Sequence, residues 1–506
     1  MKPDGNGSGT PEAPDVVLIG SGVMSAHLGA LLKELDPRLR IHLFEAAPSF
    51  APESSHGWHN AGTGHAGLCE LSYTPTVEAD GSVPVGKAIE IFAQFEQSKQ
   101  FWAHAVEAGL TGPVRSFLNP VPHLSFVHGD YWVRYLRARH HGLKAHHFFE
   151  DMELSDDPAT IGSWAPLLME GREVFPVAAT RSPGGTDIDF GSLARQLVGW
   201  IGRQPGCTVA AGSRVTGLEK SNDGWRVTVT DQASGSTRSV TARFVFVGAG
   251  GGSLPLLQRA GLPDAHGLGG FPIGGQWLVC DNPATVERHQ AKVYGQPQPE
   301  APTMAVPHLD TRILDGRQSL LFGPFAAWTT RFLSRSGSAL DLPRSIRPHN
   351  LATLARVGLG NMELVRYLID QGTQTMESRL RTLQLFYPAA REEDWRLRDA
   401  GIRVQAITKT DGEAGIVHYG TEVITSADRS LCSLLGASPG ASVCVSIALE
   451  VIEKCFPHLV RDPEPRARLA TMVPGRLEDV TQPAHAARHR HLTARCTEIL
   501  GLGVRA

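Results

Sequence analysis

Hydrophobic residues at the start of the chain follow first a strand pattern and then a helix pattern. Residues 15–20 form a short β-branched run that ends in glycine, which is typical of a buried parallel strand. Residues 23–36 place apolar side chains at helical spacing, and residues 40–45 form a second apolar run. A strand, a helix and a second strand in this order predict a βαβ unit, the core element of an α/β fold.

The rest of the chain changes its hydrophobic period several times. Three apolar strand patterns over residues 215–220, 225–231 and 239–247 are separated by polar turns and predict a β-meander. Residues 270–325 are rich in strand and turn patterns, which predicts a second sheet. Helical spacing predicts helices over residues 87–110, 131–142, 190–203, 349–385 and 440–456.

A glycine-rich turn connects the first predicted strand to the first predicted helix. Gly20 permits a tight turn, and Gly22 lets the backbone and the helix N-terminus approach a pyrophosphate. Ser25 occupies the third glycine position, where a small side chain still permits close packing of helix and strand. Glu45 ends the second strand and is placed to accept hydrogen bonds from ribose hydroxyls. We expect dinucleotide contacts from Gly20, Ser21, Gly22, Met24, Ser25 and Glu45.

The turn alone is compatible with NAD or FAD, and also with a surface turn that binds nothing. A second glycine turn, which starts Gly248-Ala249-Gly250, follows the strand into which the β-meander leads. Flavoproteins of this architecture return a meander into a strand that ends beside the first turn. The second turn therefore favours FAD, with contacts from Gly248, Ala249 and Gly250.

Composition and charge exclude several classes of protein. The net charge of −3 and the pI of about 6.7 argue against nucleic acid as the main partner. The seven cysteines include no C-x-x-C pair, so we expect no disulfide framework, no metal site and a reducing compartment. No uncharged apolar run is long enough to predict a membrane-spanning helix, and the Gly-, Pro- and Ser-rich residues 1–13 predict a disordered leader.

Residues 53–75, ESSHGWHNAGTGHAGLCELSYTP, closely resemble the malate:quinone oxidoreductase family. Further blocks resemble the same family in the same order, from about residue 14 to residue 460, and only the tail after about Pro463 diverges. These blocks are RSF at 115–117, PHLSF at 122–126, WAPL at 164–167, MEGR at 169–172, GGQ at 274–276, AKVYG at 291–295, VPHLDTR at 306–312, LFGPF at 321–325 and LLGASPGA at 434–441.

The resemblance implies a fold like that of D-amino-acid oxidase: a Rossmann-like FAD-binding domain, and an α+β domain on a mixed or antiparallel sheet that covers the flavin. It implies oxidation of (S)-malate to oxaloacetate by hydride transfer to non-covalent FAD, followed by reduction of a membrane quinone. We expect residues 14–80, 185–260 and 400–460 in the FAD domain, residues 81–184 and 261–399 in the substrate domain, and a helical tail at 461–506.

Malate oxidation requires a base that removes the proton of the C2 hydroxyl. His65 is the first candidate, because the glycines around it permit close approach to a ring and a neutral imidazole accepts a proton near pH 7. His308 is the rival, and His123 is a weaker third. Each of the three is equally compatible with a buried histidine that has only a structural role.

The two carboxylates of malate require cationic or amide donors. Arg312 is the first candidate, because a guanidinium holds a carboxylate through two parallel hydrogen bonds, and we place it with His65 and His308 in the catalytic group. Any of these side chains is also compatible with a structural charge or a turn contact. Further candidates for substrate binding are Arg115, Gln276, Lys292, Tyr294 and Arg403.

Two small-residue segments are candidates for contact with the flavin ring. The first lies in the block at 53–75, and the second precedes the predicted helix at 440–456, whose N-terminus would stabilise negative charge on the reduced ring. An ordinary helix-starting turn is the alternative for the second segment. The expected residues are Asn60, Gly62, Thr63, Gly64, Gly436, Ala437, Ser438, Pro439 and Gly440.

No motif in the sequence marks a quinone site. We expect a cytoplasmic protein that contacts the inner face of the cell membrane peripherally. Residues 484–506 combine arginines with leucines, which is compatible with a helix on anionic lipid and also with a terminal helix packed on its own domain. Two other functions stay open: oxidation of another 2-hydroxy acid such as L-2-hydroxyglutarate, with oxygen as a possible acceptor, and a non-catalytic nucleotide-binding module.

Overall fold

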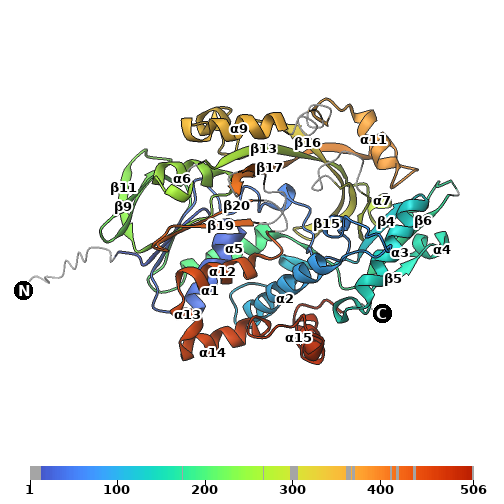
Figure 1. Ribbon diagram of the computed structural model, residues 1–506, viewed down its shortest axis with the longest axis horizontal. Helices are drawn as coiled ribbons and strands as arrows, with labels where there is room; N and C mark the ends of the chain where they lie inside the picture. Colours follow the sequence, from blue (N-terminus) through green and yellow to red (C-terminus); the bar gives the residue numbers. More distant parts are fainter. Residues whose placement is uncertain are drawn as a thin grey trace, which may run out of the picture.

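The computed structural model of the chain describes residues 13–173, 175–265, 267–296, 306–360, 366, 371–410, 413–416, 421–436 and 440–503. Two large sheets form the framework, and helices cover their outer faces (Figure 1). The first sheet carries the predicted dinucleotide turn, and the second carries most of the predicted substrate residues.

The first sheet has six strands in the order β19-β20-β12-β1-β2-β8. Strand β1 pairs in parallel with both β2 and β12, and only β19 runs antiparallel to its neighbour. Helix α1 connects β1 to β2, so the predicted βαβ unit is confirmed. The strands are β1 (Val16–Ile19), β2 (Ile41–Phe44), β8 (Thr208–Ala210), β12 (Phe244–Val247), β19 (Thr421–Thr425) and β20 (Leu431–Gly436), and the helix is α1 (Val23–Leu35).

One face of this sheet is covered by a helical layer with a continuous apolar core. Helix α1 packs between α5 and α12, and α12 contacts the long helix α2. A buried hydrogen bond from Trp102 Nε1 of α2 to His27 Nε2 of α1, 2.8 Å long, crosses this layer. The helices are α2 (Gly86–Glu107), α5 (Phe190–Gly202) and α12 (Cys444–Cys455).

The predicted β-meander is also confirmed. Strands β9 (Ser213–Ser221), β10 (Gly224–Asp231) and β11 (Thr237–Ala242) form an antiparallel sheet that leads into β12. Helix α6 (Ser253–Ala260) follows the second glycine turn and packs on β9.

The second sheet has nine strands in the order β18-β17-β13-β16-β15-β14-β4-β6-β5. Its pairs are antiparallel except for β14 with β4, so the sheet is mixed, as the resemblance implies. A small sheet of β3 (Leu118–Pro120) and β7 (Thr186–Ile188) lies beside it. The nine strands are β4 (His123–His128), β5 (Glu153–Ser155), β6 (Val177–Ser182), β13 (Gly269–Cys280), β14 (Lys292–Tyr294), β15 (His308–Leu314), β16 (Arg317–Trp328), β17 (Arg396–Thr410) and β18 (Glu413–Ile416).

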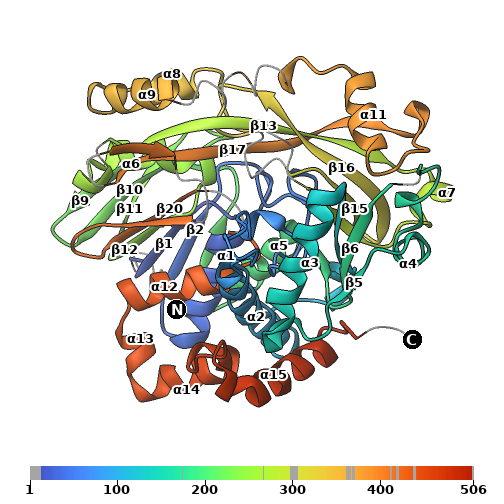
Figure 2. The ribbon, with the colours of Figure 1, turned by 45° about the vertical axis from the view of Figure 1, so that its right-hand side comes forward.

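Helices also cover the outer side of the second sheet (Figure 2). The helix predicted over residues 349–385 is divided into α9 and α11, and the segments 361–365 and 367–370 lie outside the described residues. The helices of this half are α3 (Asp130–Lys144), α4 (Pro158–Trp164), α7 (Pro283–Val286), α8 (Asp341–Ser345), α9 (Pro348–Gly360) and α11 (Met376–Gln384).

The expected domain boundaries divide two elements that the structure keeps together. Strand β17 crosses the boundary at residue 400, yet its residues 396–407 pair with β13 in the second sheet. Helix α2, expected in the substrate domain, packs on the helices of the first sheet. We therefore propose that β17 belongs with the substrate domain and α2 with the FAD domain.

The C-terminal residues form helices that pack below α1 and α2 (Figure 2). Thr493 of α15 donates a 2.8 Å hydrogen bond to Glu96 of α2, and Arg495 pairs with Glu107 at 3.0 Å. Leu492 is buried, so the apolar side of α15 faces its own chain. No helix in the described part of the chain has the length and apolarity to cross a bilayer. The helices are α13 (His458–Arg461), α14 (Pro463–Met472) and α15 (Ala486–Ile499).

We predict that His27 makes stability fall in mild acid. The residue is fully buried, and burial lowers its pKa to about 4, so the fold holds it neutral with Nδ1–H donating to Val23 O. Stability from this group is complete above the unfolded pKa of about 6.5 and is lost as pH falls toward 4, with about 2 kcal/mol lost by pH 5.

Denaturant unfolding of wild type and His27→Gln at pH 7 and pH 5 measures this contribution. The glutamine amide can keep both hydrogen bonds but does not titrate, so the variant should lose less stability between the two pH values. An equal loss in both proteins would contradict the assignment.

Candidate functional site

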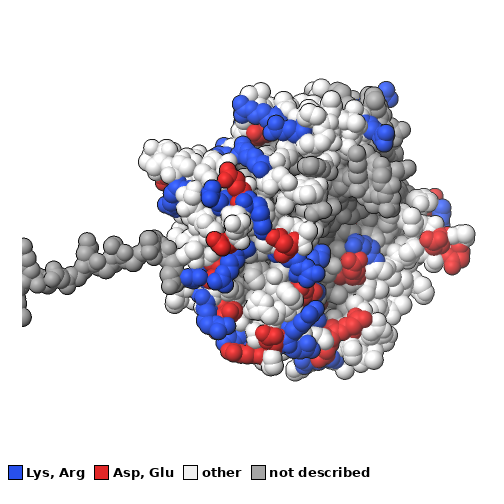
Figure 3. All heavy atoms as spheres, turned by 60° about the vertical axis from the view of Figure 1, so that its left-hand side comes forward, with Lys and Arg blue, Asp and Glu red and all other residues white. Residues whose placement is uncertain are grey.

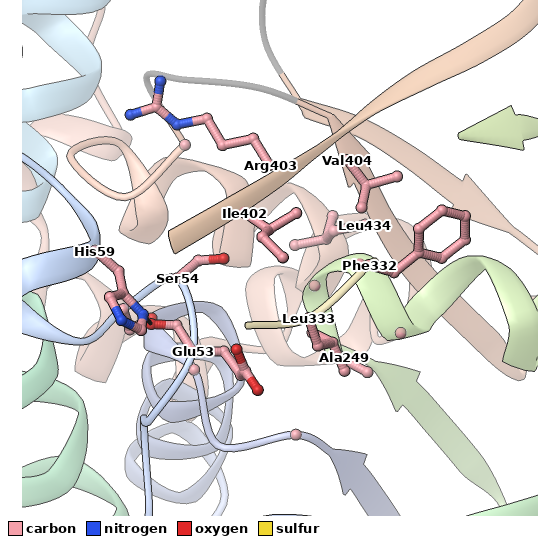
Figure 4. A pocket seen from close by; sticks show the side chains of 18 of the residues that line it. Glu53, Ser54, His59, Ala249, Phe332, Leu333, Ile402, Arg403, Val404 and Leu434 are labelled. Atoms are coloured by element: carbon pink, nitrogen blue, oxygen red, sulfur yellow. Dashed lines mark hydrogen bonds between the residues drawn. The ribbon is translucent and has the colours of Figure 1, made fainter. Parts of the chain in front are cut away.

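A cavity of about 1020 Å³ lies between the two sheets. One end is lined by the first glycine turn, and the other by Tyr294 and His308 of the second sheet. Figure 4 shows the cavity from close by, with labelled side chains from the segment that ends at His59, from β17 and from the chain after β16. The lining therefore reaches from one sheet to the other, as the binding of a dinucleotide across both sheets would require.

The first glycine turn has the shape that the sequence predicts. Gly20 has a φ of +90°, and a Cβ there would lie 2.6 Å from the carbonyl oxygen of Gly248. Gly22 is the N-cap of α1 and lines the cavity, and a Cβ there would lie 3.3 Å from Ser55 Oγ. Ser25 faces Gly248, where a Cβ would overlap the Ser25 hydroxyl. The small residue at the third position thus lets α1 lie close to β12, as expected.

Glu45 lies at the end of β2 and lines the cavity. Its carboxylate accepts hydrogen bonds from Ser21 N at 2.9 Å, Ser21 Oγ at 2.6 Å and Ala47 N at 2.9 Å. These bonds hold a nearly buried acidic group at the edge of the dinucleotide groove. Its position fits the ribose role that the sequence predicts.

The glycine loop at residues 57–64 approaches the second sheet closely. Gly62 has a φ of +66°, and a Cβ there would overlap the guanidinium of Arg312. Gly62 O accepts a 2.6 Å hydrogen bond from Ile188 N, and Gly64 N donates to Thr186 O. Asn60 Oδ1 accepts from Gly62 N at 3.0 Å and closes the turn. Glycine is required because backbone and charged side chains occupy the space where larger residues would point.

A fully buried charge cluster lies behind this loop. Asp187 Oδ1 is 2.8 Å from Arg312 Nη1 and 2.9 Å from Lys292 Nζ, and none of the three side chains is exposed. Lys292 also donates to Ala61 O at 2.7 Å, and Arg312 donates to Gly57 O at 2.8 Å. The two cations therefore bind the carbonyls of the glycine loop and fix its position against the second sheet.

His65 follows the glycine loop and lines the cavity. Its Nδ1 contacts the Glu70 carboxylate, and its backbone N–H donates to Ser442 Oγ at 3.0 Å. Burial raises the pKa of Glu70, but the nearby His65 and His123 together with a backbone hydrogen bond lower it below its usual value, so the carboxylate is held in its charged form. With Nδ1 turned to Glu70, Nε2 is left to meet a ligand.

Tyr294 and His308 form a stacked pair in the second sheet. Their ring centroids are 4.3 Å apart with planes 3° from parallel, and both residues line the cavity. Tyr294 OH lies 2.9 Å from Thr63 Oγ1, and burial raises its pKa well above the usual value, so the phenol keeps its proton. His308 Nδ1 lies 2.8 Å from Asp310 Oδ2, which is an ion-pair distance without the alignment of a hydrogen bond.

Arg403 is the candidate cation that lines the cavity. It lies on β17, and no carboxylate among the described residues pairs with its guanidinium. Burial lowers its pKa, which means that an anion beside it would be stabilised strongly. Figure 4 shows its side chain extended away from Ile402, Val404 and Leu434.

Four other predicted substrate residues do not line the cavity. Lys292 and Arg312 belong to the buried cluster, and Gln276 accepts a hydrogen bond from Arg379 and donates one to Asp399. Arg115 donates to the carbonyls of Leu118 and Gly501, near the C-terminal end. These positions argue against direct substrate contact. His123, the weaker base candidate, is likewise buried against Thr186 and outside the lining.

Most residues predicted to contact the cofactor line the cavity. Ser25 and Gly64 do not, because they pack against Gly248 and Thr186. Ala437, Ser438 and Pro439 lie outside the described residues, and Gly436 ends strand β20. The residues that do line it are Gly20, Ser21, Gly22, Met24, Glu45, Asn60, Gly62, Thr63, Gly248, Ala249, Gly250 and Gly440.

One wall of the cavity is not predicted by any pattern in the sequence. It is the segment of residues 331–347, which we name the strap. Glu53 holds it by accepting backbone hydrogen bonds from Ser334 at 2.9 Å, Arg335 at 3.2 Å and Ser336 at 3.1 Å. Phe332 O lies against Gly251, so the strap also contacts the second glycine turn. A carboxylate that pairs with backbone N–H groups about 280 residues away leaves no signal in a local pattern.

Comparisons with known proteins agree with this geometry. The family model described as malate:quinone oxidoreductase matches residues 12–502. A probable malate:quinone oxidoreductase 2 of Pseudomonas aeruginosa is 52% identical over 492 residues, covering 97% of this chain and 96% of that protein. A probable malate:quinone oxidoreductase 1 of Pseudomonas putida is 51% identical over 484 residues, covering 96% and 95%.

Solved flavoenzymes share the fold at low sequence identity. An L-α-glycerophosphate oxidase of Mycoplasma pneumoniae with FAD bound has a TM-score of 0.59 and 15% identity, covering 88% of this chain and 95% of that one. A glycine oxidase of Geobacillus kaustophilus has a TM-score of 0.56 and 15% identity, with the same coverage. These neighbours confirm the predicted fold class.

We predict that Glu53→Ala weakens flavin retention. The change removes a charged acceptor of several backbone hydrogen bonds, each worth about 1.5–3 kcal/mol, so the strap should open more often. We expect flavin release about ten times faster or more, measured by the fluorescence of freed flavin after dilution. Glu78→Ala, at an exposed glutamate that does not line the cavity, is the control. Equal rates of flavin release from the two variants would show that Glu53 does not hold the strap over the flavin.

Proposed function

The chain belongs to the malate:quinone oxidoreductase family, and we propose that its cavity oxidises malate to oxaloacetate on FAD and passes the electrons to a quinone. The observation that carries this function is the family match over residues 12–502, which contains every wall of the cavity. Relatives about half identical to the chain carry the malate name over nearly the whole length, so oxidation of another 2-hydroxy acid is not favoured.

The residues of the cavity fit FAD. The two glycine turns line the cavity, α1 begins beside it at the N-cap Gly22, and Glu45 is fixed next to them, as a pyrophosphate and its ribose would require. When bound, FAD accepts the hydride that leaves C2 of malate. These contacts are hydrogen bonds and dipoles, and on them we base the proposal of non-covalent binding.

His65 is our choice for the base that takes the proton of the C2 hydroxyl. Its Nδ1 faces the charged Glu70, which orients the ring and stabilises the imidazolium that forms when Nε2 accepts a proton. Ser442 fixes its backbone by bridging His65 N and Thr63 O. His308 has a comparable arrangement with Asp310, so it stays the rival base.

Arg403 is our choice for the residue that binds a malate carboxylate. Its fork has no carboxylate partner in the described part of the chain, and it lies near the protonated phenol of Tyr294. Tyr294 is placed to donate a further hydrogen bond to the substrate. Arg312 and Lys292, whose donors are occupied by Asp187 and loop carbonyls, position the loop.

The acceptor also determines where the protein works. Quinones of respiratory membranes dissolve in lipid, so the protein must meet a bilayer surface to reduce them. The seven cysteines fit a reducing compartment. We therefore propose a cytoplasmic protein that contacts the inner face of the membrane peripherally.

Anaerobic stopped-flow measurement of flavin absorbance tests the function and the base together. Malate should bleach the flavin of the wild type, and a quinone analogue should restore its colour, whereas 2-hydroxyglutarate and lactate should act far more slowly. His65→Ala should slow bleaching by about a hundredfold or more, as loss of a general base does.

His308→Ala is the matched variant, and flavin content measured by absorbance controls for cofactor loss. Rapid bleaching of His65→Ala together with a slow His308→Ala would transfer the base role to His308. A wild type whose flavin does not bleach with malate would exclude the proposed function.

Arg403→Lys should raise the KM for malate by about tenfold or more, because the fork of parallel hydrogen bonds is lost. Steady-state kinetics with malate and a soluble quinone analogue measure the change. Arg396→Lys, an exposed arginine on the same strand that pairs with Asp281, should leave KM unchanged. Equal KM values in all three proteins would remove Arg403 from the substrate site.

A further inference from the structure

Four large apolar side chains are exposed within one short stretch of the chain. Trp328 at the end of β16 is 56% exposed, Leu340 of the strap 49%, Ile346 43% and Leu351 of α9 55%. Trp328 pairs with Ile273 of β13, and Leu354 of α9 packs over Gly269 of the same strand. Helix α8, which lies between Leu340 and Ile346 in the chain, also contacts β13, so the four residues lie near this strand. We name it the strap face, residues 328–356.

The strap face is strongly basic. Asp341 is its single acidic residue, and its carboxylate is occupied by hydrogen bonds from Phe332 N and Ser338 N. Basic side chains are visible at the top of Figure 3, at the height that α9 occupies in Figure 1. Five exposed arginines, none paired with a described carboxylate, complete the face: Arg331, Arg335, Arg344, Arg347 and Arg356.

The C-terminal helix, the other basic segment of the sequence, is built differently. Arg490 pairs with Glu150 and Arg495 with Glu107, and Leu492 and Leu500 are buried. Its charges and its apolar side are thus satisfied within the chain. The strap face offers both unsatisfied arginines and exposed apolar groups.

The strap face also lies at the cavity. Arg344, Ile346 and Arg347 line it, together with the inner side of the strap. A compound that dissolves in lipid and must reach the cavity therefore has a short route past these residues. This argument rests on the proposed function, which requires such an acceptor.

We propose that the strap face docks on an anionic lipid bilayer and that the quinone enters the cavity beside it. Tryptophan and aliphatic side chains enter the interfacial region of a bilayer, and arginines are attracted to its anionic headgroups. Unpaired positive charges beside exposed apolar groups match this surface, whereas contact with a second copy would bring the five arginines of each chain together.

Binding of the holoenzyme to phosphatidylcholine vesicles with and without phosphatidylglycerol tests the docking surface. The wild type should cosediment with the anionic vesicles. Trp328→Ser/Leu351→Ser and Arg331→Gln/Arg356→Gln should each weaken this binding by about tenfold or more, since none of the four residues lines the cavity. Tyr131→Ser/Phe175→Ser and Arg488→Gln/Arg495→Gln are matched controls elsewhere on the surface and should bind as the wild type does.

Kinetics separate failure of this proposal from failure of the proposed function. With a short-chain soluble quinone, the strap-face variants should turn over malate like the wild type, while with a long-chain quinone in anionic vesicles they should be slower by a similar factor. Unchanged vesicle binding by these variants, or wild-type binding that ignores anionic lipid, would overturn the docking surface. A wild-type dimer in solution that the variants dissolve would also overturn it, because the face would then be a contact between copies.

Discussion

The carboxylate of Asp187 is the interaction on which the site depends. It comes from β7, receives a lysine from β14 and an arginine from β15, and all three side chains are fully buried. The two cations also bind carbonyls at residues 57 and 61, so one buried cluster joins the cofactor loop to the second sheet. Removing one partner of such a cluster costs about 3–5 kcal/mol, because it leaves an uncompensated buried charge. The position of His65 at the end of the loop follows from this cluster.

The basic residues predicted to bind substrate fall into two groups, those with a structural role and one that lines the cavity. Cations that hold the framework have their donors occupied by carboxylates and carbonyls, whereas Arg403 has no such carboxylate among the described residues. The cavity thus combines a histidine oriented by a charged carboxylate, a protonated phenol and an open guanidinium. These are the groups that a 2-hydroxy dicarboxylate needs while its hydride leaves.

Local patterns predicted the parts of the fold that local sequence determines. The βαβ unit and the meander were predicted because their apolar periods and turns lie within short segments. Strand β17 was missed, because charged residues interrupt its apolar pattern and its pairing with β13 comes from far away in sequence. The same limit applies to the site. Arg312 pairs with Asp187, and Glu53 accepts hydrogen bonds from the strap, and in both cases the partner lies more than a hundred residues away in the sequence. The first glycine turn, in contrast, is a local motif, so the sequence predicts the roles of Gly20, Gly22 and Ser25 directly.

The position of the strap has a consequence for the order in which the protein binds its cofactor and meets a membrane. Its inner side walls the dinucleotide groove through Phe332 and the hydrogen bonds to Glu53, while Arg331, Arg335 and Leu340 of the strap are exposed and do not line the groove. If the strap face rests on lipid as proposed above, the strap would have little room to lift. The polypeptide would then have to acquire its prosthetic group while still dispersed in water, and colourless chains that reach the bilayer first would stay without a cofactor.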